Sequence, residues 1–179
     1  MSRLTHRLAN VADLSALAAL MDRAIGELQR PFLDSHQITA SRRSMGLDSL
    51  LVADGTYFVV EDDEIIVGCG GWSRRATLYG GNDAVALRDE RLLDPLCEPA
   101  RIRAMYTEPS RARQGIGRLI LGLCEDAARA DGFSRVELMA TLAGEPLYRA
   151  CGYAVIERVD RLGKDEVAVP GATMGKTLA

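Results

Sequence analysis

Residues that build metal centres and disulfide frameworks are scarce in this sequence. Only two histidines, His6 and His36, and four cysteines occur among the 179 residues, and no two cysteines have the Cys-x-x-Cys spacing. The cysteines lie far apart, at Cys69, Cys97, Cys124 and Cys151. Such separated cysteines, with so few imidazoles, support neither a zinc site nor a disulfide framework. We therefore expect no metal.

The sequence also lacks an excess of positive charge and any long apolar segment. Its net charge is −3 and its pI is about 5.5, whereas proteins that follow nucleic-acid phosphates are usually strongly basic. No charged-then-apolar leader occurs. We therefore expect no nucleic acid and no membrane as partners, and a cytoplasmic location. With 47% hydrophobic and 26% charged residues, the chain can bury one good core, which predicts a single domain over residues 1–179.

The most informative segment is a glycine-rich turn between a strand-like run and a helix. Residues 102–107 alternate in polarity, Pro109 ends that run, and apolar residues recur at helical spacing over 116–130. Gly115 and Gly117 leave backbone N–H groups free at the helix start, where the helix dipole also favours an anion. This order of strand, glycine turn and helix predicts a phosphate-binding site.

Two other nucleotide-binding turns fit this segment less well. A P-loop requires Gly-Lys-Ser/Thr, but Gly117 is followed by Arg118 and Leu119. A dinucleotide-binding turn has a small residue where this chain has Ile120, and an acid about twenty residues further on, a place that Glu137 fills. The bulk of Ile120 counts against a dinucleotide-binding turn. A nucleotide-binding domain stays open as a further hypothesis.

Residues Ala112-Arg113-Gln114-Gly115-Ile116-Gly117 resemble the Gln/Arg-x-x-Gly-x-Gly/Ala signature of the GNAT superfamily of acyl-CoA-dependent N-acyltransferases. Alanine replaces the first residue of the signature, and Arg111 and Arg113 can supply the missing positive charge. A second GNAT signature, aromatic-Tyr-x-x-x-Gly-Phe/Tyr, is matched by Leu147-Tyr148-Arg149-Ala150-Cys151-Gly152-Tyr153. The resemblance implies an α/β (α+β) fold with a mixed, mostly antiparallel central sheet flanked by helices.

The resemblance also implies how each part of the site acts, with acetyl-CoA as the acyl-donor substrate. Tyr148 takes the position of the general acid, and the N–H of Met105 that of the oxyanion donor. Thr141 stands where many members of the family carry an asparagine. The cofactor-binding set is Met105, Tyr106, Thr107, Arg113, Gln114, Gly115, Ile116, Gly117, Arg118, Thr141 and Tyr148. From the residues alone, Tyr148 fits a core tyrosine and the segment at Met105 fits an ordinary buried strand equally well.

The sequence gives no clear general base. Some relatives have a glutamate on the strand before the glycine turn, where this chain has Arg101 and Arg103. The nearby acids are Glu98, Glu108 and Glu145, which also fit solvated surface residues. A base that acts through water, or no base at all for an amine of low pKa, is equally open. We expect five arginines to gather around the CoA site, Arg101, Arg103, Arg111, Arg113 and Arg118.

The acceptor is open: a polyamine, an aminoglycoside, an amino acid, or a protein N-terminus or lysine. The few hints are the acidic turn Asp62-Asp63-Glu64, the carboxylates of Asp83, Asp89 and Glu90, and Gly70-Gly71-Trp72, which lines the acceptor cleft or simply packs in the core. We expect an N-acetyltransferase that acetylates a small-molecule or peptide amine by direct attack in a ternary complex. The alternative is a catalytically weak regulatory module that binds acyl-CoA; a homodimer is open.

The remaining pattern predicts the other elements. A first helix, capped by residues 10–13, carries an apolar face on Val11, Leu14, Leu17, Leu20, Met21, Ala24, Ile25 and Leu28. We expect a short helix or loop at 31–51, a β-hairpin at 57–60 and 65–68, a long connection at 73–100, a helix end at Gly132, closing strands at 135–141, 153–159 and 167–178, and a short helix containing 147–150.

Overall fold

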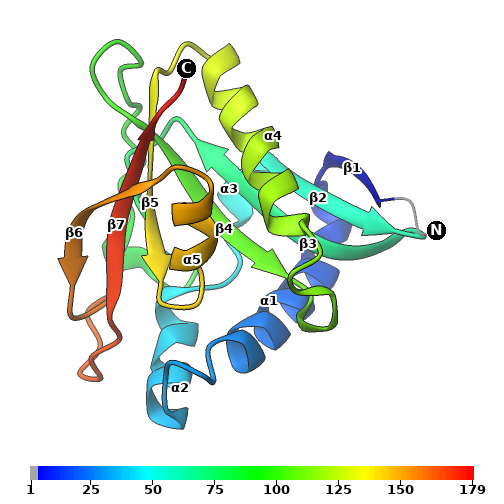
Figure 1. Ribbon diagram of the computed structural model, residues 1–179, viewed down its shortest axis with the longest axis vertical. Coiled ribbons are helices and arrows are strands. Elements are labelled where there is room, and N and C mark those ends of the chain that lie inside the picture. The colour runs from blue at the N-terminus through cyan, green and yellow to red at the C-terminus, as the bar shows by residue number, and fades with distance from the viewer. Residues whose placement is uncertain (1–3) are drawn as a thin grey trace.

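Figure 1 shows a seven-stranded sheet with helices against both of its faces. The computed structural model describes residues 4–179. The strands lie in the order β1-β2-β3-β4-β5-β7-β6. Their bounds are β1 Leu4–Leu8, β2 Tyr57–Asp62, β3 Ile65–Ser73, β4 Ala100–Thr107, β5 Arg135–Thr141, β6 Ala154–Val159 and β7 Gly171–Thr177. The helices are α1 Leu14–Leu28, α2 Ser35–Ser44, α3 Ser49–Ala53, α4 Ile116–Ala130 and α5 Glu145–Ala150, with 3-10 turns η1 Val11–Asp13, η2 Val85–Leu87 and η3 Pro109–Arg111.

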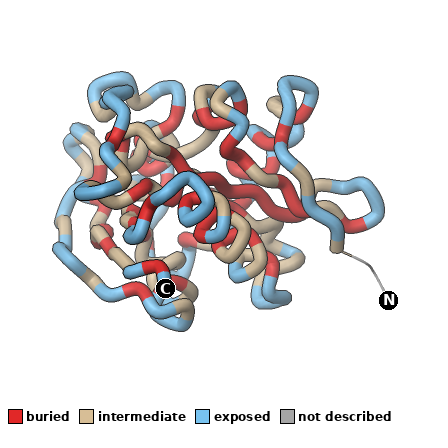
Figure 2. Tube along the Cα trace, turned by 90° about the horizontal axis from the view of Figure 1, so that it is seen from above, coloured by how far each residue is buried: buried red, intermediate tan, exposed pale blue. Residues whose placement is uncertain are grey.

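The core lies in two layers, one on each face of the sheet. On one face α4 packs through Ile116 and Ile120, and α5 adds Tyr148. On the other face α1 packs through Leu17 and Met21, beside residues of α2 and α3. Figure 2 shows the buried part of the chain running through the middle of the molecule. The predicted fold class, a mixed and mostly antiparallel sheet flanked by helices, is confirmed.

The junction of β4 and β5 differs from every other strand pair in the sheet. It is parallel, whereas the other neighbours are antiparallel. Only Ala100 with Val136 and Arg101 with Glu137 are in register. Beyond these pairs the two strands separate, as Figure 1 shows, so residues 102–107 have no strand partner on that side. The sheet therefore has a gap at its centre.

The strongly patterned segments form the elements that their sequences predict. Asn10 caps η1, the turn that leads into α1, since its Oδ1 accepts a hydrogen bond of 2.9 Å from the N–H of Ala12. The hairpin of β2 and β3 turns through Asp63 and Glu64, which have φ of 48° and 66°. Helix α4 and strand β5 also lie where expected. Val11 is wrong as part of the apolar face, because it is 76% exposed.

Strand β1 departs from the expectation, whereas the short helix or loop expected at 31–51 is a helix over most of its length. Strand β1, which the sequence analysis did not include, is a five-residue edge strand whose side chains are mostly exposed, so it has little apolar pattern. The segment 31–51 holds α2 and the start of α3. Helix α2 buries Ser41 and Ser44 beside Ile38. Because these polar residues lie on the inner face, the sequence does not show the helical spacing of apolar residues there.

The segment Gly70-Gly71-Trp72 belongs to the core. Trp72 is 4% exposed and meets Phe133 edge to face, with 6.2 Å between ring centroids. At Gly70 an added Cβ would lie 2.5 Å from Sδ of Met105, so the glycine permits close packing of β3 on β4. None of the three lines the cavity described below, which agrees with their packing in the core.

Candidate active site

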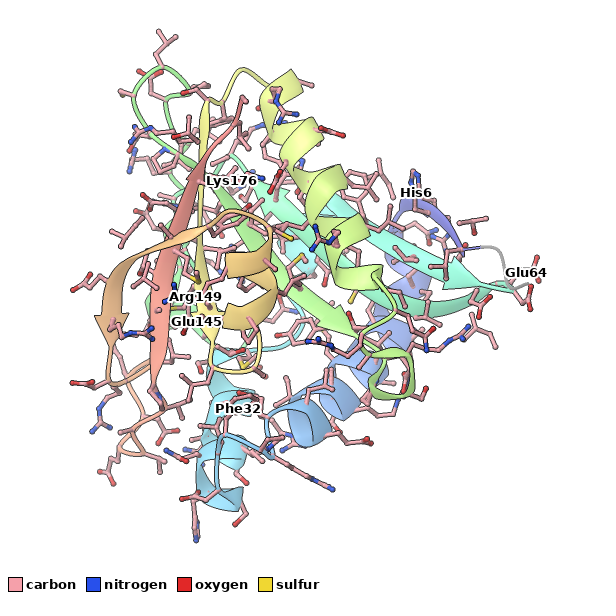
Figure 3. All side chains as sticks on the ribbon, in the orientation of Figure 1. His6, Phe32, Glu64, Glu145, Arg149 and Lys176 are labelled. Carbon is pink, nitrogen blue, oxygen red and sulfur yellow. The ribbon has the colours of Figure 1, made fainter. Side chains whose placement is uncertain are left out.

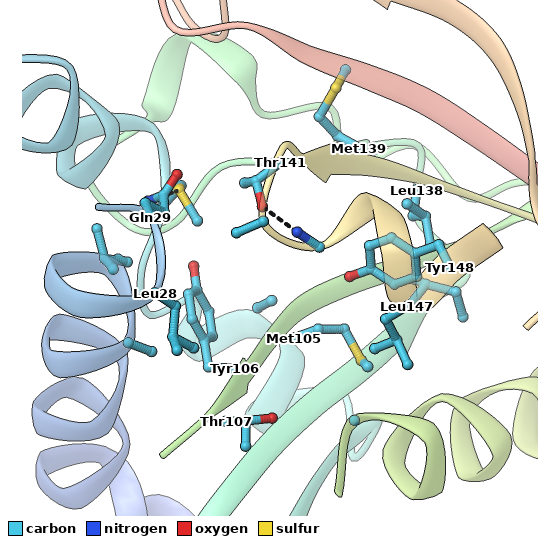
Figure 4. Close-up of a pocket in the computed structure, with 18 of the residues that line it drawn as sticks. Leu28, Gln29, Met105, Tyr106, Thr107, Leu138, Met139, Thr141, Leu147 and Tyr148 are labelled. Carbon is cyan, nitrogen blue, oxygen red and sulfur yellow. Dashed lines mark hydrogen bonds between the residues drawn. The ribbon is translucent and has the colours of Figure 1, made fainter. Parts of the chain in front are cut away.

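A cavity of about 620 Å³ occupies the gap between β4 and β5. Its walls come from both layers of the molecule: residues 102–107 of β4, Leu138 and Thr141 of β5, the start of α4, helix α5 and the end of α1. Figure 4 shows these walls facing one another. One cavity therefore joins the α4 face of the sheet to its α1 face.

The turn before α4, residues 112–118 and here called the phosphate loop, presents a row of unused donors. Arg113 and Gly115 have left-handed backbones, with φ of 66° and 85°, which turns the chain into the helix. The backbone N–H groups of residues 113–118 donate to no residue within 4–179. Free N–H groups at the positive end of a 15-residue helix favour an anion.

The phosphate loop lies directly against α5. A Cβ on Gly117 would be 2.8 Å from Cδ2 of Leu147, so the glycine lets the two helices approach closely. Of the predicted loop residues, Arg113, Gly115, Ile116, Gly117 and Arg118 line the cavity, whereas Gln114 does not. The side chain of Gln114 is exposed and accepts a weak 3.5 Å hydrogen bond from Arg111.

Tyr148 projects from α5 into the cavity. The residue is 7% exposed, and its ring packs against Tyr153 with 5.9 Å between centroids. Its hydroxyl forms no hydrogen bond with the described residues and points into the space between Met105 and Thr141 (Figure 4). Burial raises the pKa of Tyr148 above its ordinary value, so the phenol keeps its proton at neutral pH. A neutral phenol in this place can donate a proton to a bound group.

The other predicted residues also line this cavity, and each has a local contact. Thr141 uses its Oγ1 to accept a 3.1 Å hydrogen bond from the N–H of Gly144, which fixes the turn into α5. Tyr106 points to the opposite face from Met105, and its hydroxyl accepts a 2.8 Å hydrogen bond from the N–H of Gly46. The β4 backbone at 105–107 faces the gap without a strand partner.

The expected cluster of five arginines is wrong for Arg101 and Arg103. Arg101 lies at the closed end of the gap, 2.7 Å from Glu137. Arg103 lines the cavity, but on the α1 face, where it is buried in an ion pair with Asp48. Spacing along a strand could not distinguish these partners, because the two acids come from distant segments.

The loop arginines differ from one another as well. Arg111 forms an ion pair with Asp62 at the end of β2. Arg113 and Arg118 line the cavity and have no carboxylate partner in the part of the chain that the structure describes. These two cations therefore supply the free positive charge at the phosphate loop.

The three candidate bases are all held by arginines. Glu98 pairs with Arg91 at 3.0 Å, and Glu108 pairs with Arg23 at 2.7 Å. Hydrogen bonds from Arg158 and Arg149 lower the pKa of Glu145 to about 2. None of these glutamates lines the cavity. They are therefore unsuited to take a proton there.

The carboxylates that the sequence suggested for binding an acceptor amine lie outside this cavity. The turn Asp62-Asp63-Glu64 is the tip of the β2–β3 hairpin, and Figure 3 shows Glu64 at the edge of the molecule, away from Phe32. Asp83, Asp89 and Glu90 do not line the cavity either. These carboxylates therefore lie outside the cavity that holds the phosphate loop and Tyr148.

The sequence profile of the acetyltransferase (GNAT) domain matches residues 53–155. The chain belongs to this family. Among residues 4–179 no group of three His, Cys, Asp or Glu side chains could hold a metal ion, and no helix in that range is long and apolar enough to cross a membrane. A comparison with curated proteins finds no match.

Solved structures share the GNAT fold of this chain. The PaiA N-acetyltransferase of Thermoplasma acidophilum, in complex with coenzyme A, is 12% identical with a TM-score of 0.65, over 98% of this chain and 99% of that one. YncA of Salmonella typhimurium, with its cofactor acetyl-CoA, is 17% identical with a TM-score of 0.65, over 99% and 95%. A GCN5-related N-acetyltransferase of Rhodopseudomonas palustris is 18% identical with a TM-score of 0.70, over 99% and 98%.

The cavity wall of this GNAT protein on the α1 face has no signal in the sequence. That wall comes from the end of α1, the segment after α2, the long connection at 78–81 and Leu162 in the β6–β7 connection. These four segments lie far apart in the sequence and carry no shared pattern. The long connection 73–100 thus contributes to the site through residues 78–81.

Proposed function

We propose that the protein is an N-acetyltransferase that transfers the acetyl group of acetyl-CoA to a primary amine in a ternary complex. One observation carries the proposal: the free N–H groups of the phosphate loop, the unpaired edge of β4 and the hydroxyl of Tyr148 all face one cavity. Acetyl-CoA contains a pyrophosphate, an extended arm with amides and a thioester, in that order. The free N–H groups, the unpaired strand edge and the hydroxyl are suited to these three parts in the same order.

The residues fit acetyl-CoA as a substrate. The phosphate loop, with Arg113 and Arg118, is suited to phosphates, and the β4 edge at Met105, Tyr106 and Thr107 is suited to the amides of the pantetheine arm. Thr141 faces the same gap from β5, as Figure 4 shows. Backbone contacts of this kind depend little on side-chain identity, which suits the alanine at the first position of the signature.

In the proposed reaction, the neutral amine attacks the thioester carbonyl. A C–N bond forms, and the N–H of Met105 stabilises the oxyanion. The C–S bond then breaks, Tyr148 donates its phenolic proton to the departing thiolate, and the proton lost by the amine returns to Tyr148 through water. The products are the N-acetylated amine and CoA.

A thiol-release assay with acetyl-CoA and a broad panel of small and peptide amines tests the proposal. Binding is measured separately as a change in melting temperature with CoA, with ATP as the control ligand. At a CoA concentration of a hundred times Kd, the free energy of unfolding should rise by about 2.7 kcal/mol. Stabilisation by CoA without acetylation of any amine would favour the regulatory module, and stabilisation by ATP alone would favour a nucleotide-binding domain.

A further inference from the structure

The α1 side of the cavity is a distinct, mostly apolar chamber. We call it the acceptor chamber, and its apolar wall includes Leu28, Phe32, Met45, Met139 and Leu162. Phe32, in the turn after α1, lines the chamber and is 48% exposed. An apolar wall of this kind binds apolar surface and excludes the water that would solvate a charge.

The acceptor chamber has no anionic group for a second ammonium. None of the residues within 4–179 that line the cavity is an aspartate or a glutamate. Burying an ammonium without a carboxylate costs several kcal/mol. A polyamine or an aminoglycoside, with several ammonium groups, would pay this cost in the chamber.

The chamber also has no free cation for a carboxylate. Its one charged wall residue is Arg103, whose Nη2 lies 3.0 Å from Asp48 and 2.7 Å from the carbonyl oxygen of Gly80. Its Nη1 donates to the carbonyl oxygen of Thr77 at 3.2 Å. The guanidinium of Arg103 is thus held within the protein by Asp48, which Arg88 also contacts at 3.5 Å, and by two carbonyl oxygens.

Two uncharged polar groups remain available to orient an amine. Gln29 donates its Nε2 to Ser41 at 3.3 Å, while its Oε1 accepts no hydrogen bond from residues 4–179. The hydroxyl of Tyr106 accepts from Gly46 and keeps its own proton free to donate. Figure 4 shows Gln29 and Tyr106 on the wall of the cavity beside Leu28. A neutral N–H group matches such partners better than a charged one does.

On the basis of the proposed acetyl transfer, we propose that the acceptor is a small primary amine on an uncharged, apolar body, with neither a second ammonium nor a carboxylate. The chamber itself then promotes deprotonation. An apolar surrounding disfavours the ammonium form, so the bound amine loses its proton to water before it attacks. This requires no carboxylate base, in agreement with the arginine-held state of Glu98, Glu108 and Glu145.

Three amines of equal chain length test the proposal on the wild-type protein. Hexylamine, hexane-1,6-diamine and 6-aminohexanoate share the reacting amine and five methylenes, and they end in a methyl, an aminomethyl cation (CH2–NH3+) or a carboxylate. We expect kcat/KM for hexylamine, from thiol release, to exceed both others at least tenfold. Equal or greater kcat/KM for either charged amine overturns the inference and leaves acetyl transfer intact. Preference for an uncharged peptide N-terminus overturns the small-molecule assignment, and no acetylation of any amine overturns the proposed function itself.

A carboxylate placed in the chamber should invert the preference. Leu28→Glu is compared with Leu28→Gln, which has the same shape without the charge, and Met45→Glu with Met45→Gln repeats the test at a second position. We expect the ratio of kcat/KM for the diamine over hexylamine to rise at least tenfold in a Glu variant and to stay within threefold in its Gln partner. Melting curves with CoA confirm folding. An unchanged ratio in both Glu variants overturns the placement of the acceptor.

Discussion

Nη2 of Arg103 lies 3.0 Å from Oδ2 of Asp48, and both side chains are 4% exposed. The pair joins β4 to the residue that precedes α3, where Asp48 also accepts a 3.1 Å hydrogen bond from the N–H of Leu50. Burial lowers the pKa of Arg103, and Asp48 opposes that effect, so the guanidinium stays charged. The two residues stabilise each other across the cavity wall.

Breaking this pair should be costly. Asp48→Asn keeps a good cap for α3 but leaves the guanidinium of Arg103 buried without an anion, so the free energy of unfolding should fall by about 3–5 kcal/mol. Urea denaturation measures the loss. The double variant with Arg103→Met, which removes the buried charge, should recover most of it. A loss below about 1 kcal/mol in the single variant would contradict a buried ion pair.

Tyr148→Phe should separate binding from turnover. The ring and its packing on Tyr153 remain, but the proton donor is gone, so kcat should fall by roughly one to four orders of magnitude with little change in CoA affinity. Thiol release and calorimetric CoA titration provide the two numbers.

Tyr153→Phe is the matched control for that experiment. Its hydroxyl donates to Glu125 at 3.0 Å, away from the cavity, so its removal should lower the free energy of unfolding by about 1–2 kcal/mol while kcat changes only a few-fold. An unchanged kcat in a folded Tyr148→Phe variant would make Tyr148 a packing residue.

Gly115 allows charge and shape to be tested separately at the phosphate loop. Its φ is 85° and no atom lies within 4 Å of an added Cβ, so asparagine, which tolerates this conformation, should fit. Gly115→Asp adds a carboxylate of the same shape beside the free N–H groups and should raise the Kd for CoA at least tenfold above that of Gly115→Asn. Isothermal titration gives both values, and equal affinities would place the phosphates elsewhere.

The ion pairs of Glu145 should make the free energy of unfolding depend on pH in the acidic range. Arg158, at 2.7 Å, and Arg149, at 2.9 Å, lower the pKa of Glu145 from 4.5 to about 2, and the pair with Arg158 connects α5 to β6 (Figure 3 labels Glu145 and Arg149). A depressed pKa in the folded state stabilises the protein fully above about pH 4.5, and that stabilisation is lost as the pH falls toward 2.

The measurement compares wild type with Glu145→Gln in urea at pH 6 and at pH 2.5. Since both arginines are about half exposed, solvent screening limits the effect, and wild type should lose about 0.5–1 kcal/mol more than the variant between these pH values. Parallel losses in the two proteins would show that Glu145 contributes nothing to acid sensitivity.

The sequence predicted those parts of the fold whose residue pattern lies within one short segment. The glycines at 115 and 117 and the apolar spacing of α4 lie within one short segment, so the loop and the helix could be placed from sequence. At α2 the pattern left a short helix and a loop both open, because Ser41 and Ser44 occupy its inner face. An edge strand as short and exposed as β1 has equally little pattern.

Long-range pairing limited the prediction of the site. Arg103 and Asp48 are separated by 55 positions, and nothing in the spacing of either residue indicates the other. The acceptor chamber likewise combines the ends of α1 and α2 with two distant connections. Resemblance to a family supplied the residues of the phosphate loop and Tyr148, but the neutral character of the chamber emerges only when these segments are brought together.

The gap between β4 and β5 also bears on self-association. An unpaired strand edge normally offers a template on which a second chain can add a strand and start aggregation. Here the unpaired edge at 102–107 lies inside the molecule, between the phosphate loop and the end of α1, rather than at the rim of the sheet. The protein therefore keeps an edge that can pair with a slender ligand while its position shields it from another polypeptide.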